Sequence, residues 1–577
     1  MTKKRIFTII VWVVIIALFL VPALLGLLFS SIIGITQTEN AQAAQSRSYR
    51  QIEYTELTKE QRLEDFDYFY TMIKTSLPAV YEMTESFSYS VLDREQTYRR
   101  MVEECSNDYE FMALMFAMIN DVPSGHAGFV LPDYSDYFLA GYFRTETVGL
   151  SLTKNLQGKI EAYYDYLCGI QKQYEAMNLT RMAFAYYDGQ YVCTLGREMF
   201  YDSTIISIDG RDAAEYLSSE YAIMGQIGYD SKNKLTYRAD FCFAESGEDG
   251  VDVLLQLTDG TQLTVRLYKD YDRCFSLYYG YFFSNEYVDY NSDELFVAAP
   301  DADEDAITVY MDDRYDLAYV LLSSVDYSDG TAVADKLRSI SGCQNIVIDM
   351  RGNGGGVSSF WDNYIYPALY RDDAYFEATG IMPDNEYTKG LFPGLFKGYV
   401  SMLLSGTYFT DAKTLPDGMY DCNNGKYKQY TFSHTMQGDP TLSYPSDRNV
   451  YYIVNNYTCS AADEITQMVK SCGLGKVVGT NTKGEGLIFG VCCDWLPNSL
   501  LMYTYCPTYV FDSEGVNNTL YGTLPDLWGG TSAEGLIASN ELDMQGLDSL
   551  SPQYRPDWDY NYNIIIEDIA AKSIVAA

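Results

Sequence analysis

The spacing of apolar residues predicts two helices in the first part of the chain. Thr58 and Gln61 fit a capping box, and five apolar side chains then recur at helical spacing: Leu63, Phe66, Phe69, Tyr70 and Ile73. This helix is expected to end before Pro78. A second, mostly apolar helix is expected over about 109–120 and is followed by a short loop. Residues 37–145 are therefore predicted to be a helical N-terminal segment.

The pattern changes to strands over 146–275. A strand is expected to begin at 203 and end in an Asp-Gly turn, and 251–267 is predicted to be a hairpin through a second Asp-Gly turn. A short helix is expected at 212–219. This pattern is typical of a small binding module, and an acidic stretch at 276–306 is expected to be a linker.

From residue 307 onward, apolar strands alternate with helices. Three runs are almost wholly apolar, as strands buried on both faces require: 317–322, 345–349 and 450–454. The alternation predicts a parallel or mixed sheet covered by helices, so we expect an α/β core within an α+β multidomain chain. This core is expected to span 307–530 and to be followed by a C-terminal extension, 531–577. A long Tyr-, Gly- and Asp-rich insert, 370–445, is expected to be a lid or a subdomain.

The N-terminus carries an apolar run that is long enough to span a bilayer. Basic residues at positions 3–5 precede a mostly apolar stretch, 6–35. Basic residues before a span favour a cytoplasmic N-terminus. We therefore expect residues 1–36 to be an uncleaved single-pass anchor in the cell membrane, with the rest of the chain extracytoplasmic. A signal peptide cleaved near Ala43, which would give a secreted protein, is the alternative.

Charge and composition restrict the classes of function. The formal net charge is -39, whereas binding to nucleic acid needs basic patches, so nucleic acid is excluded as a partner. The twelve cysteines and two histidines show no spacing typical of a zinc site. The acidic run 301–305 is similar to part of a calcium loop, but Ala306 occupies the position where the sharp turn needs glycine. We therefore expect no metal ion and no organic cofactor.

Ser460 is a candidate nucleophile. It follows a buried strand and begins a predicted helix that Gly473 would end. A serine in this place is commonly a helix N-cap, and that interpretation stays open. The same geometry directs free N–H groups and the positive end of the helix dipole toward the hydroxyl oxygen, which suits a reaction that passes through an oxyanion.

Three consecutive glycines, Gly354 to Gly356, follow another buried strand. A tight turn would explain them, because glycine adopts positive φ angles without steric strain. Alternatively, they allow a close approach of the backbone to a ligand. The N–H groups of Gly354 and Ala461 would then form an oxyanion hole. Asp349 and Arg351 flank the glycines and are expected to form an ion pair that fixes the turn.

A serine nucleophile needs a general base, and histidine is the usual one. His126 lies between Gly125 and Gly128 in the loop after the second helix, a suitable position for an active-site group. His434 lies in the long insert. His126 is the preferred candidate, although a single histidine in a loop can also be incidental.

Four motifs occur in order along the chain: Asp349-Met-Arg351-Gly-Asn353-Gly-Gly-Gly356, Thr458-Cys-Ser460-Ala-Ala-Asp463, Val478-Gly479-Thr-Asn-Thr482-Lys-Gly484-Glu-Gly486 and Gly522-Thr-Leu-Pro525-Asp526. Over roughly 310–530 they resemble the core motifs of the tail-specific, or C-terminal processing, protease family, which includes tricorn-type members. Residues 121–129 are similar to the Asp-x-His segment of the histidine-using branch. Residues 200–270 resemble a PDZ-like module, which lies between that segment and the core in this family.

The resemblance implies a mixed-sheet core of the ClpP/crotonase-like type, Ser460 as nucleophile, and Gly354 and Ala461 as oxyanion donors. Many members use a lysine in the second variable position of Thr-x-Gly-x-Gly, where this chain has Glu485. A simple Ser-Lys dyad is therefore doubtful, and a histidine-using site is favoured.

Two charged residues of the Thr-x-Gly-x-Gly motif complete the predicted site. Glu485 is the candidate that would orient or charge-stabilise the base, His126. Lys483 lies two residues before Glu485, on the same face of an extended segment, and is the alternative base.

These patterns predict a serine endopeptidase that cleaves extracytoplasmic polypeptides through an acyl-enzyme on Ser460. A non-catalytic protein that binds a ligand or peptide on the same scaffold is the main alternative. An esterase that acts on small molecules is a further one. The predicted partners are a polypeptide substrate and, through the N-terminal helix, the membrane.

Overall fold

The computed structural model describes most of the chain after residue 53. The described ranges are 54–87, 90–130, 143–144, 154–283, 307–327, 329–388, 408–415, 422–487, 491–512, 515–530 and 559–576, with a few single positions between 531 and 558. The predicted span, 6–35, and the calcium-loop-like run, 301–305, lie outside them. Within these ranges, every helix is too short or too polar to cross a bilayer.

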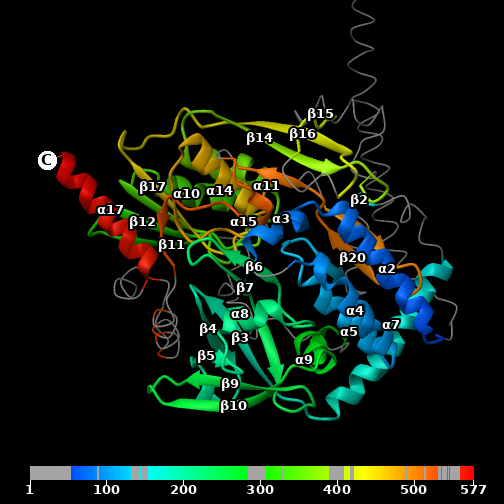
Figure 1. Ribbon diagram of the computed structural model, residues 1–577. Helices are drawn as coiled ribbons and strands as arrows, with labels where there is room; N and C mark the ends of the chain where they lie inside the picture. Colours follow the sequence, from blue (N-terminus) through cyan, green and yellow to red (C-terminus); the bar gives the residue numbers. More distant parts are fainter. Residues whose placement is uncertain are drawn as a thin grey trace, which may run out of the picture.

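A six-stranded mixed sheet forms the core, in the order β11-β12-β13-β17-β18-β22. Its strands β11, β12 and β17 are labelled in Figure 1. Its strands are β11 (Thr308–Asp312), β12 (Leu317–Leu321), β13 (Asn345–Asp349), β17 (Asn449–Val454), β18 (Lys476–Gly479) and β22 (Leu527–Trp528). Only the β11–β12 pair is antiparallel. The predicted apolar strands and the expected α/β fold class are therefore confirmed.

Helices cover both faces of this sheet, because the strand residues alternate between two hydrophobic clusters. Ala318 and Val320 face the larger cluster together with α10 (Gly330–Ser339) and α14 (Ala461–Cys472). Leu317 and Tyr319 face α17 (Tyr560–Ala576), which lies along the opposite side (Figure 1). The part predicted only as a C-terminal extension thus supplies a helix that closes the core.

The N-terminal helices pack directly on the core. They are α2 (Lys59–Ser76), α3 (Ala79–Ser86), α4 (Glu95–Glu104) and α5 (Asp108–Ile119). The predicted capping box of Thr58 and Gln61 is present. After α5, strand β1 (Gly128–Val130) pairs with β20 (Met502–Tyr505), which belongs to the core. One hydrophobic cluster runs through both parts, so the loop between α5 and β1 is held against the core.

The strand-rich region is a closed six-stranded barrel with its own hydrophobic cluster. Its strands are β3 (Arg181–Tyr187), β4 (Gln190–Leu195), β5 (Thr204–Ile208), β8 (Phe241–Ala244), β9 (Gly250–Gln256) and β10 (Gln262–Tyr268). The predicted β9–β10 hairpin and the short helix α8 (Ala213–Ser219) are confirmed. The two-stranded sheet of β6 (Ile227–Asp230) and β7 (Leu235–Arg238) accompanies the barrel. The likeness to a PDZ module stays a prediction.

Two helices differ from the predicted boundaries of this module. Lys154–Glu175 form α7, although strands were expected from 146. The apolar residues of α7 follow helical spacing, with Ile160, Tyr163 and Leu167 buried. Tyr271–Phe283 form α9, so the expected linker begins later than 276. Burial against α5 explains α9, because Phe275 packs edge-on against Tyr109 and Phe116.

The long insert contributes a second sheet, in the order β15-β16-β14-β21. Its strands are β14 (Ala374–Pro383), β15 (Tyr408–Asp411), β16 (Tyr427–Met436) and β21 (Tyr509–Phe511). β14 and β16 form a long antiparallel pair that extends along the top of the core in Figure 1. Pairing of β14 with β21 anchors the insert to the core, and the indole N–H of Trp361 donates to the sulfur of Met436.

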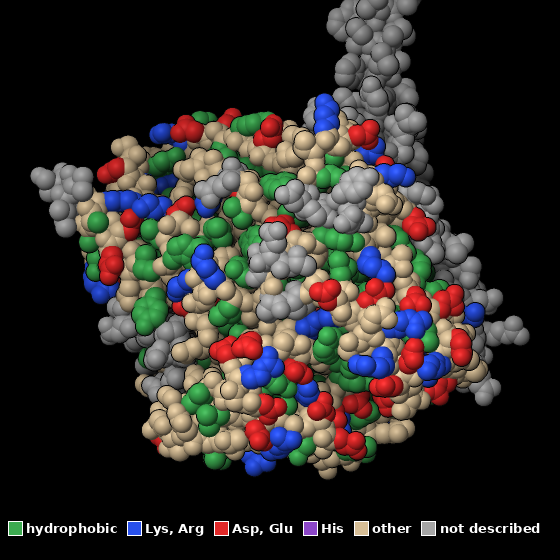
Figure 2. Space-filling view, viewed as in Figure 1, with side chains coloured by type: hydrophobic (Ala, Val, Ile, Leu, Met, Phe, Trp, Pro, Cys, Tyr) green, Lys and Arg blue, Asp and Glu red, His purple; other side chains and the backbone are tan. Residues whose placement is uncertain are grey.

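Acidic and basic side chains are mixed on the described surface. On the face shown in Figure 2, they are interspersed over the region of the N-terminal helices and the barrel. On this face the charged side chains therefore do not gather in one place.

Candidate active site

Ser460 lies at the junction between β17 and α14 and does not cap the helix. Its backbone has φ 55° and ψ −129°, and its side chain makes no capping hydrogen bond. A positive φ at a residue other than glycine is strained and is typical of functional sites. The neighbouring thiol of Cys459 is buried, which raises its pKa to about 12, so it stays protonated and is a poor nucleophile. The Ser460 hydroxyl is thus left for another partner.

That partner is His126, in the loop between α5 and β1. The Nε2 atom of His126 lies 3.2 Å from the Oγ atom of Ser460. The hydroxyl of Thr504 donates to the carbonyl oxygen of His126 at 2.9 Å and fixes the loop beside β20. The His126 side chain is 16% exposed, so the ring is largely protected from water.

Glu485 lies on the other side of the same imidazole. Its Oε2 atom is 2.6 Å from His126 Nδ1 and also accepts from the backbone N–H of His126 at 3.0 Å. The carboxyl group is completely buried, and among the described residues its Oε1 atom has no hydrogen-bond partner. Glu485 has a φ of 62°, and its N–H donates to Asn518 Oδ1. A strained backbone thus holds a buried acid against the ring of a histidine.

The glycine-rich turn lies directly against Ser460. Gly355 has a φ of 108°, and a Cβ atom added there would lie 2.8 Å from Ser460 Cβ and 2.9 Å from the Ala461 nitrogen. Only glycine allows this approach. The side chain of Asn353 accepts from the Gly355 N–H at 2.9 Å and donates to the Leu322 carbonyl oxygen at 2.8 Å.

The structure leaves two backbone donors beside Ser460. Within the described residues, the N–H groups of Gly354 and Ala461 donate to no protein acceptor. Ala461 is the first residue of α14, where N–H groups have no partner in the helix. The flanking Asp349 and Arg351 form the expected ion pair at 2.7 Å, and Arg351 also binds Asp559.

The alternative base, Lys483, points elsewhere. Its Nζ atom donates to the side-chain oxygen of Gln226, and its backbone N–H donates to the Thr458 carbonyl oxygen at 2.8 Å. Lys483 thus lies close to Glu485 in the sequence, but its side chain reaches toward the barrel side of the molecule. The replacement of the family's usual lysine by Glu485 could be read from the motif, but the partner of Lys483 could not.

Asp463 is buried at the centre of a hydrogen-bond network behind Ser460. Its carboxylate accepts from the hydroxyl groups of Thr482 (2.5 Å) and Thr523 (2.6 Å) and from the Gly486 N–H (3.0 Å). Burial raises the pKa of Asp463, and these hydrogen bonds oppose that rise. The network holds the loop on which Glu485 lies.

A buried ion cluster fixes the other end of the His126 loop. The carboxylate of Asp121 accepts from Arg94 at 2.8 Å, from Tyr98 at 2.5 Å and from Arg238 at 2.6 Å. Burial acts to raise the pKa of Asp121, but the two guanidinium groups hold it below its usual range. Sequence reasoning missed the role of Asp121, although it lies in the segment that resembles the family.

The second histidine belongs to a separate acidic group. His434 lies in β16, and its Nε2 atom is 2.8 Å from Asp362 Oδ1, a contact that raises the pKa of His434. Glu464, one turn after Ser460, accepts from the Ser358 hydroxyl. Burial, with the nearby Asp362 carboxylate, raises the pKa of Glu464 to about 7.

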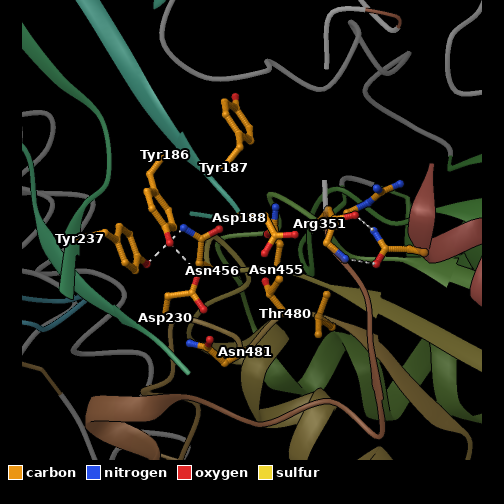
Figure 3. Close-up of a pocket in the computed structure, with 13 residues that line it drawn as sticks. Tyr186, Tyr187, Asp188, Asp230, Tyr237, Arg351, Asn455, Asn456, Thr480 and Asn481 are labelled. Atoms are coloured by element: carbon orange, nitrogen blue, oxygen red, sulfur yellow. Dashed lines mark hydrogen bonds between the residues drawn. The ribbon is translucent and has the colours of Figure 1, made fainter. Parts of the chain in front are cut away.

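A crevice lies between the barrel and the carboxyl ends of the core strands (Figure 3). Tyr186 and Tyr237, from the barrel side, stack with their ring centroids 4.2 Å apart, and Asn455 and Asn456 line the core side. Many of its polar groups bond one another. The Tyr186 hydroxyl donates to Asp230 at 2.6 Å. Arg351 lines the crevice, whereas Ser460, His126 and Glu485 do not.

The residues predicted for chemistry therefore converge from four distant segments. The structure brings together Ser460, His126 and Glu485 and places the glycine turn beside them, whereas Lys483 and His434 bond to other residues. Among the described residues, no three His, Cys, Asp or Glu side chains form a group that could hold a metal ion. The arrangement can activate an alcohol and stabilise an oxyanion.

Comparison with known proteins gives one family. Residues 316–526 match the sequence model of peptidase family S41. No curated protein sequence matches the chain. The matched residues contain the glycine turn, Ser460 and Glu485, whereas His126 lies before them.

Several solved structures are similar to the chain at low sequence identity. Mature CPAF complexed with lactacystin is 11% identical, with a TM-score of 0.44 over 84% of this chain and 97% of that chain. The photosystem II D1 C-terminal processing protease is 14% identical, with a TM-score of 0.32 over 82% and 93%. The tricorn protease is 13% identical, with a TM-score of 0.26 over 89% and 37%.

The family match confirms the resemblance to the tail-specific, or C-terminal processing, proteases. The match covers residues 316–526, which contain Ser460 and Glu485, and over these residues the chain is similar to the serine peptidases of family S41.

Proposed function

We propose that the chain is an endopeptidase in which Ser460 attacks the scissile carbonyl carbon and forms an acyl-enzyme. One observation carries this proposal. A single imidazole, that of His126, lies within hydrogen-bond distance of both Ser460 Oγ (3.2 Å) and Glu485 Oε2 (2.6 Å). A nucleophile, a base and a group that orients the base are the arrangement that serine hydrolysis requires.

The carboxylate of Glu485 can only accept a hydrogen bond, so it favours the tautomer in which His126 Nδ1 carries the proton. Nε2 is then free to take the proton of Ser460 as the hydroxyl attacks. The positive charge that develops on the ring lies beside the buried carboxylate of Glu485 and is stabilised by it. His126 next gives this proton to the leaving amine, and the C–N bond breaks.

The N–H groups of Gly354 and Ala461 hold the negative oxygen of the tetrahedral intermediate in this scheme. Each donor of this kind typically contributes about 3 kcal/mol to transition-state stabilisation. A water molecule then attacks the acyl carbon, with His126 again accepting a proton. Hydrolysis releases the carboxylic acid and restores the Ser460 hydroxyl.

We infer that the substrates are polypeptides outside the cytoplasm. The apolar run 6–35, preceded by basic residues, supports a membrane anchor with the catalytic part on the outer side. Labelling of intact cells with a reagent that cannot cross the membrane tests this location. Modification of this protein only after lysis would contradict it.

Replacing Ser460 with Ala tests the chemistry. We expect the Ser460→Ala variant to lose hydrolysis of a fluorogenic peptide and labelling by a serine-directed fluorophosphonate, while its thermal unfolding stays close to that of the wild type. Turnover by this variant would overturn the assignment of the nucleophile. A wild-type protein that neither cleaves peptides nor becomes labelled would favour the non-catalytic binding protein.

A further inference from the structure

Lys483 is joined to the barrel side of the molecule by a single side chain. The Nζ atom of Lys483 donates to the Oε1 atom of Gln226, which immediately precedes β6. The Gln226 carbonyl oxygen accepts from the Ala239 N–H at 2.8 Å, so its backbone is held beside the barrel. Lys483 is separated from Glu485 by one residue, and it therefore connects the loop that carries Glu485 to Gln226.

The other end of the Gln226 amide bonds to the loop that carries His126. Its Nε2 atom donates to the carbonyl oxygen of Ser124, two residues before His126. The next residue strengthens this connection, because the N–H of Ile227 donates to the Asn120 carbonyl oxygen at 2.9 Å. One glutamine thus bonds to both loops that meet at the imidazole.

The space between the two loops is closely filled. A Cβ atom added to Gly125 would lie 2.6 Å from Cys459 Sγ, 3.4 Å from Glu485 Oε2 and 3.6 Å from Lys483 Cε. The stem of Lys483 therefore packs beside the loop of His126 while its ammonium group reaches Gln226. A shift of either loop would change the distances from the imidazole to its two partners.

We propose that Lys483 and Gln226 are positioning residues, which together fix the His126 loop against the Glu485 loop through the bridge Lys483–Gln226–Ser124. This inference rests on the proposed function, because the bridge matters through the proton transfer that His126 performs. The lysine that the motif offers as an alternative base thereby has a different role. It donates hydrogen bonds and accepts no proton during the reaction.

Charged groups near the bridge agree with a donor role for Lys483. The Asp240 carboxyl group accepts from the Tyr457 hydroxyl at 3.2 Å. Burial raises the pKa of Asp240 to about 6, and the charge of Lys483 opposes this rise. Gln226 and Lys483 line a crevice that continues from the one in Figure 3 through Tyr237.

The Lys483→Arg variant tests whether Lys483 acts as a hydrogen-bond donor or as the general base. Arginine can donate to Gln226 but stays protonated in proteins, so it cannot act as a general base. We expect Lys483→Arg to keep a kcat within about fivefold of the wild type. Lys483→Ala, which removes the donor, is expected to lower kcat by about 10- to 100-fold, as misplaced catalytic groups do, with little change in KM. An arginine variant as inactive as Ser460→Ala would overturn the proposal.

The Gln226→Ala variant removes the glutamine side chain of the same bridge. We expect its kcat to fall about as far as that of Lys483→Ala. The double variant is expected to be no slower than the slower single variant, because both changes remove one connection. Gln190→Ala, at an exposed position of β4, and Lys336→Ala, at an exposed position of α10, are the matched controls and should keep the wild-type rate. Multiplicative losses in the double variant would contradict a shared bridge.

Hydrogen–deuterium exchange tests the bridge without using catalysis. In Gln226→Ala we expect faster exchange of peptides that cover 121–130, and unchanged exchange in β13 and β17. Equal exchange of the 121–130 peptides in the variant and the wild type would overturn the bridge even if peptidase activity is confirmed. If the wild type shows no peptidase activity or labelling, the proposed function fails, and the exchange comparison still decides whether the bridge exists.

Discussion

His126 Nε2 lies 3.2 Å from Ser460 Oγ, although 334 positions separate the two residues in the sequence. Local structure places each of them with little freedom. Ser460 is fixed by the start of α14, and His126 by the pairing of β1 with β20 and by the hydroxyl of Thr504. The contact is therefore a property of the packed N-terminal segment and core, and it does not depend on a mobile side chain alone.

Glu485→Gln should leave the geometry largely intact but remove the negative charge beside the imidazole. We expect kcat to fall by about 10³- to 10⁴-fold, as for the loss of the carboxylate that orients a catalytic histidine. Steady-state kinetics with a peptide substrate measure this. Asp384→Asn, at an exposed position of the insert, is a control that should stay near the wild-type rate. A Glu485→Gln kcat within tenfold of the wild type would remove Glu485 from the proposed site.

Gly125→Ala should displace the His126 loop, because the new methyl group would meet Cys459 Sγ at 2.6 Å. We expect at least about a tenfold lower kcat, by misplacement of the imidazole. In the double variant with Cys459→Ala, the next contacts are 3.4 Å and 3.6 Å away, so activity should partly return. Gly128→Ala, where a Cβ would meet nothing within 4 Å, is the control. A double variant as slow as Gly125→Ala would exclude the clash as the cause.

Glu464→Gln should flatten the pH dependence of stability. Burial raises the pKa of Glu464 from 4.5 to about 7, so the folded state binds this proton more tightly than the unfolded state. Its contribution to the unfolding free energy is therefore largest below about pH 4.5 and falls as the pH rises toward about 7. The raised pKa of His434 acts in the same direction. Urea unfolding at pH 5 and pH 8 measures the free energy of unfolding of the wild type and of Glu464→Gln. If the difference between the two pH values is the same in both proteins, Glu464 does not cause the pH dependence.

Asp121→Ala should destabilise the protein strongly. It would leave the buried guanidinium groups of Arg94 and Arg238 without their shared carboxylate. Breaking a buried pair in this way typically costs about 3–5 kcal/mol. Urea unfolding measures the loss, and Asp67→Ala, which removes an exposed contact to Arg99, should change it by less than about 1 kcal/mol. Equal effects of the two variants would argue against the buried cluster.

Local patterns predicted much of the fold. The capping box at Thr58, the hairpin of β9 and β10 and the apolar strands of the core follow from spacing and turn residues alone. Boundaries were less predictable where tertiary packing decides. α9 occupies part of the expected linker because Phe275 packs against α5, a contact that no local pattern contains.

The candidate site likewise contains residues that could be predicted from the sequence and residues that could not. Ser460 and the glycine turn could be found because each lies in a short motif at the end of a strand. The partner of Lys483 could not, because Gln226 is 257 positions away and has no motif of its own. The shared carboxylate of Asp121 was likewise hidden, since Arg238 lies in a different structural part.

The meeting of His126 with Glu485, 359 positions later, has a consequence during biosynthesis. A ribosome releases the loop of the histidine long before it has made the glutamate. An incomplete nascent chain that ends before Glu485 therefore lacks the carboxylate that lies against His126 in the folded protein. The order in which the polypeptide is made thus delays the meeting of these residues until both parts of the chain are present.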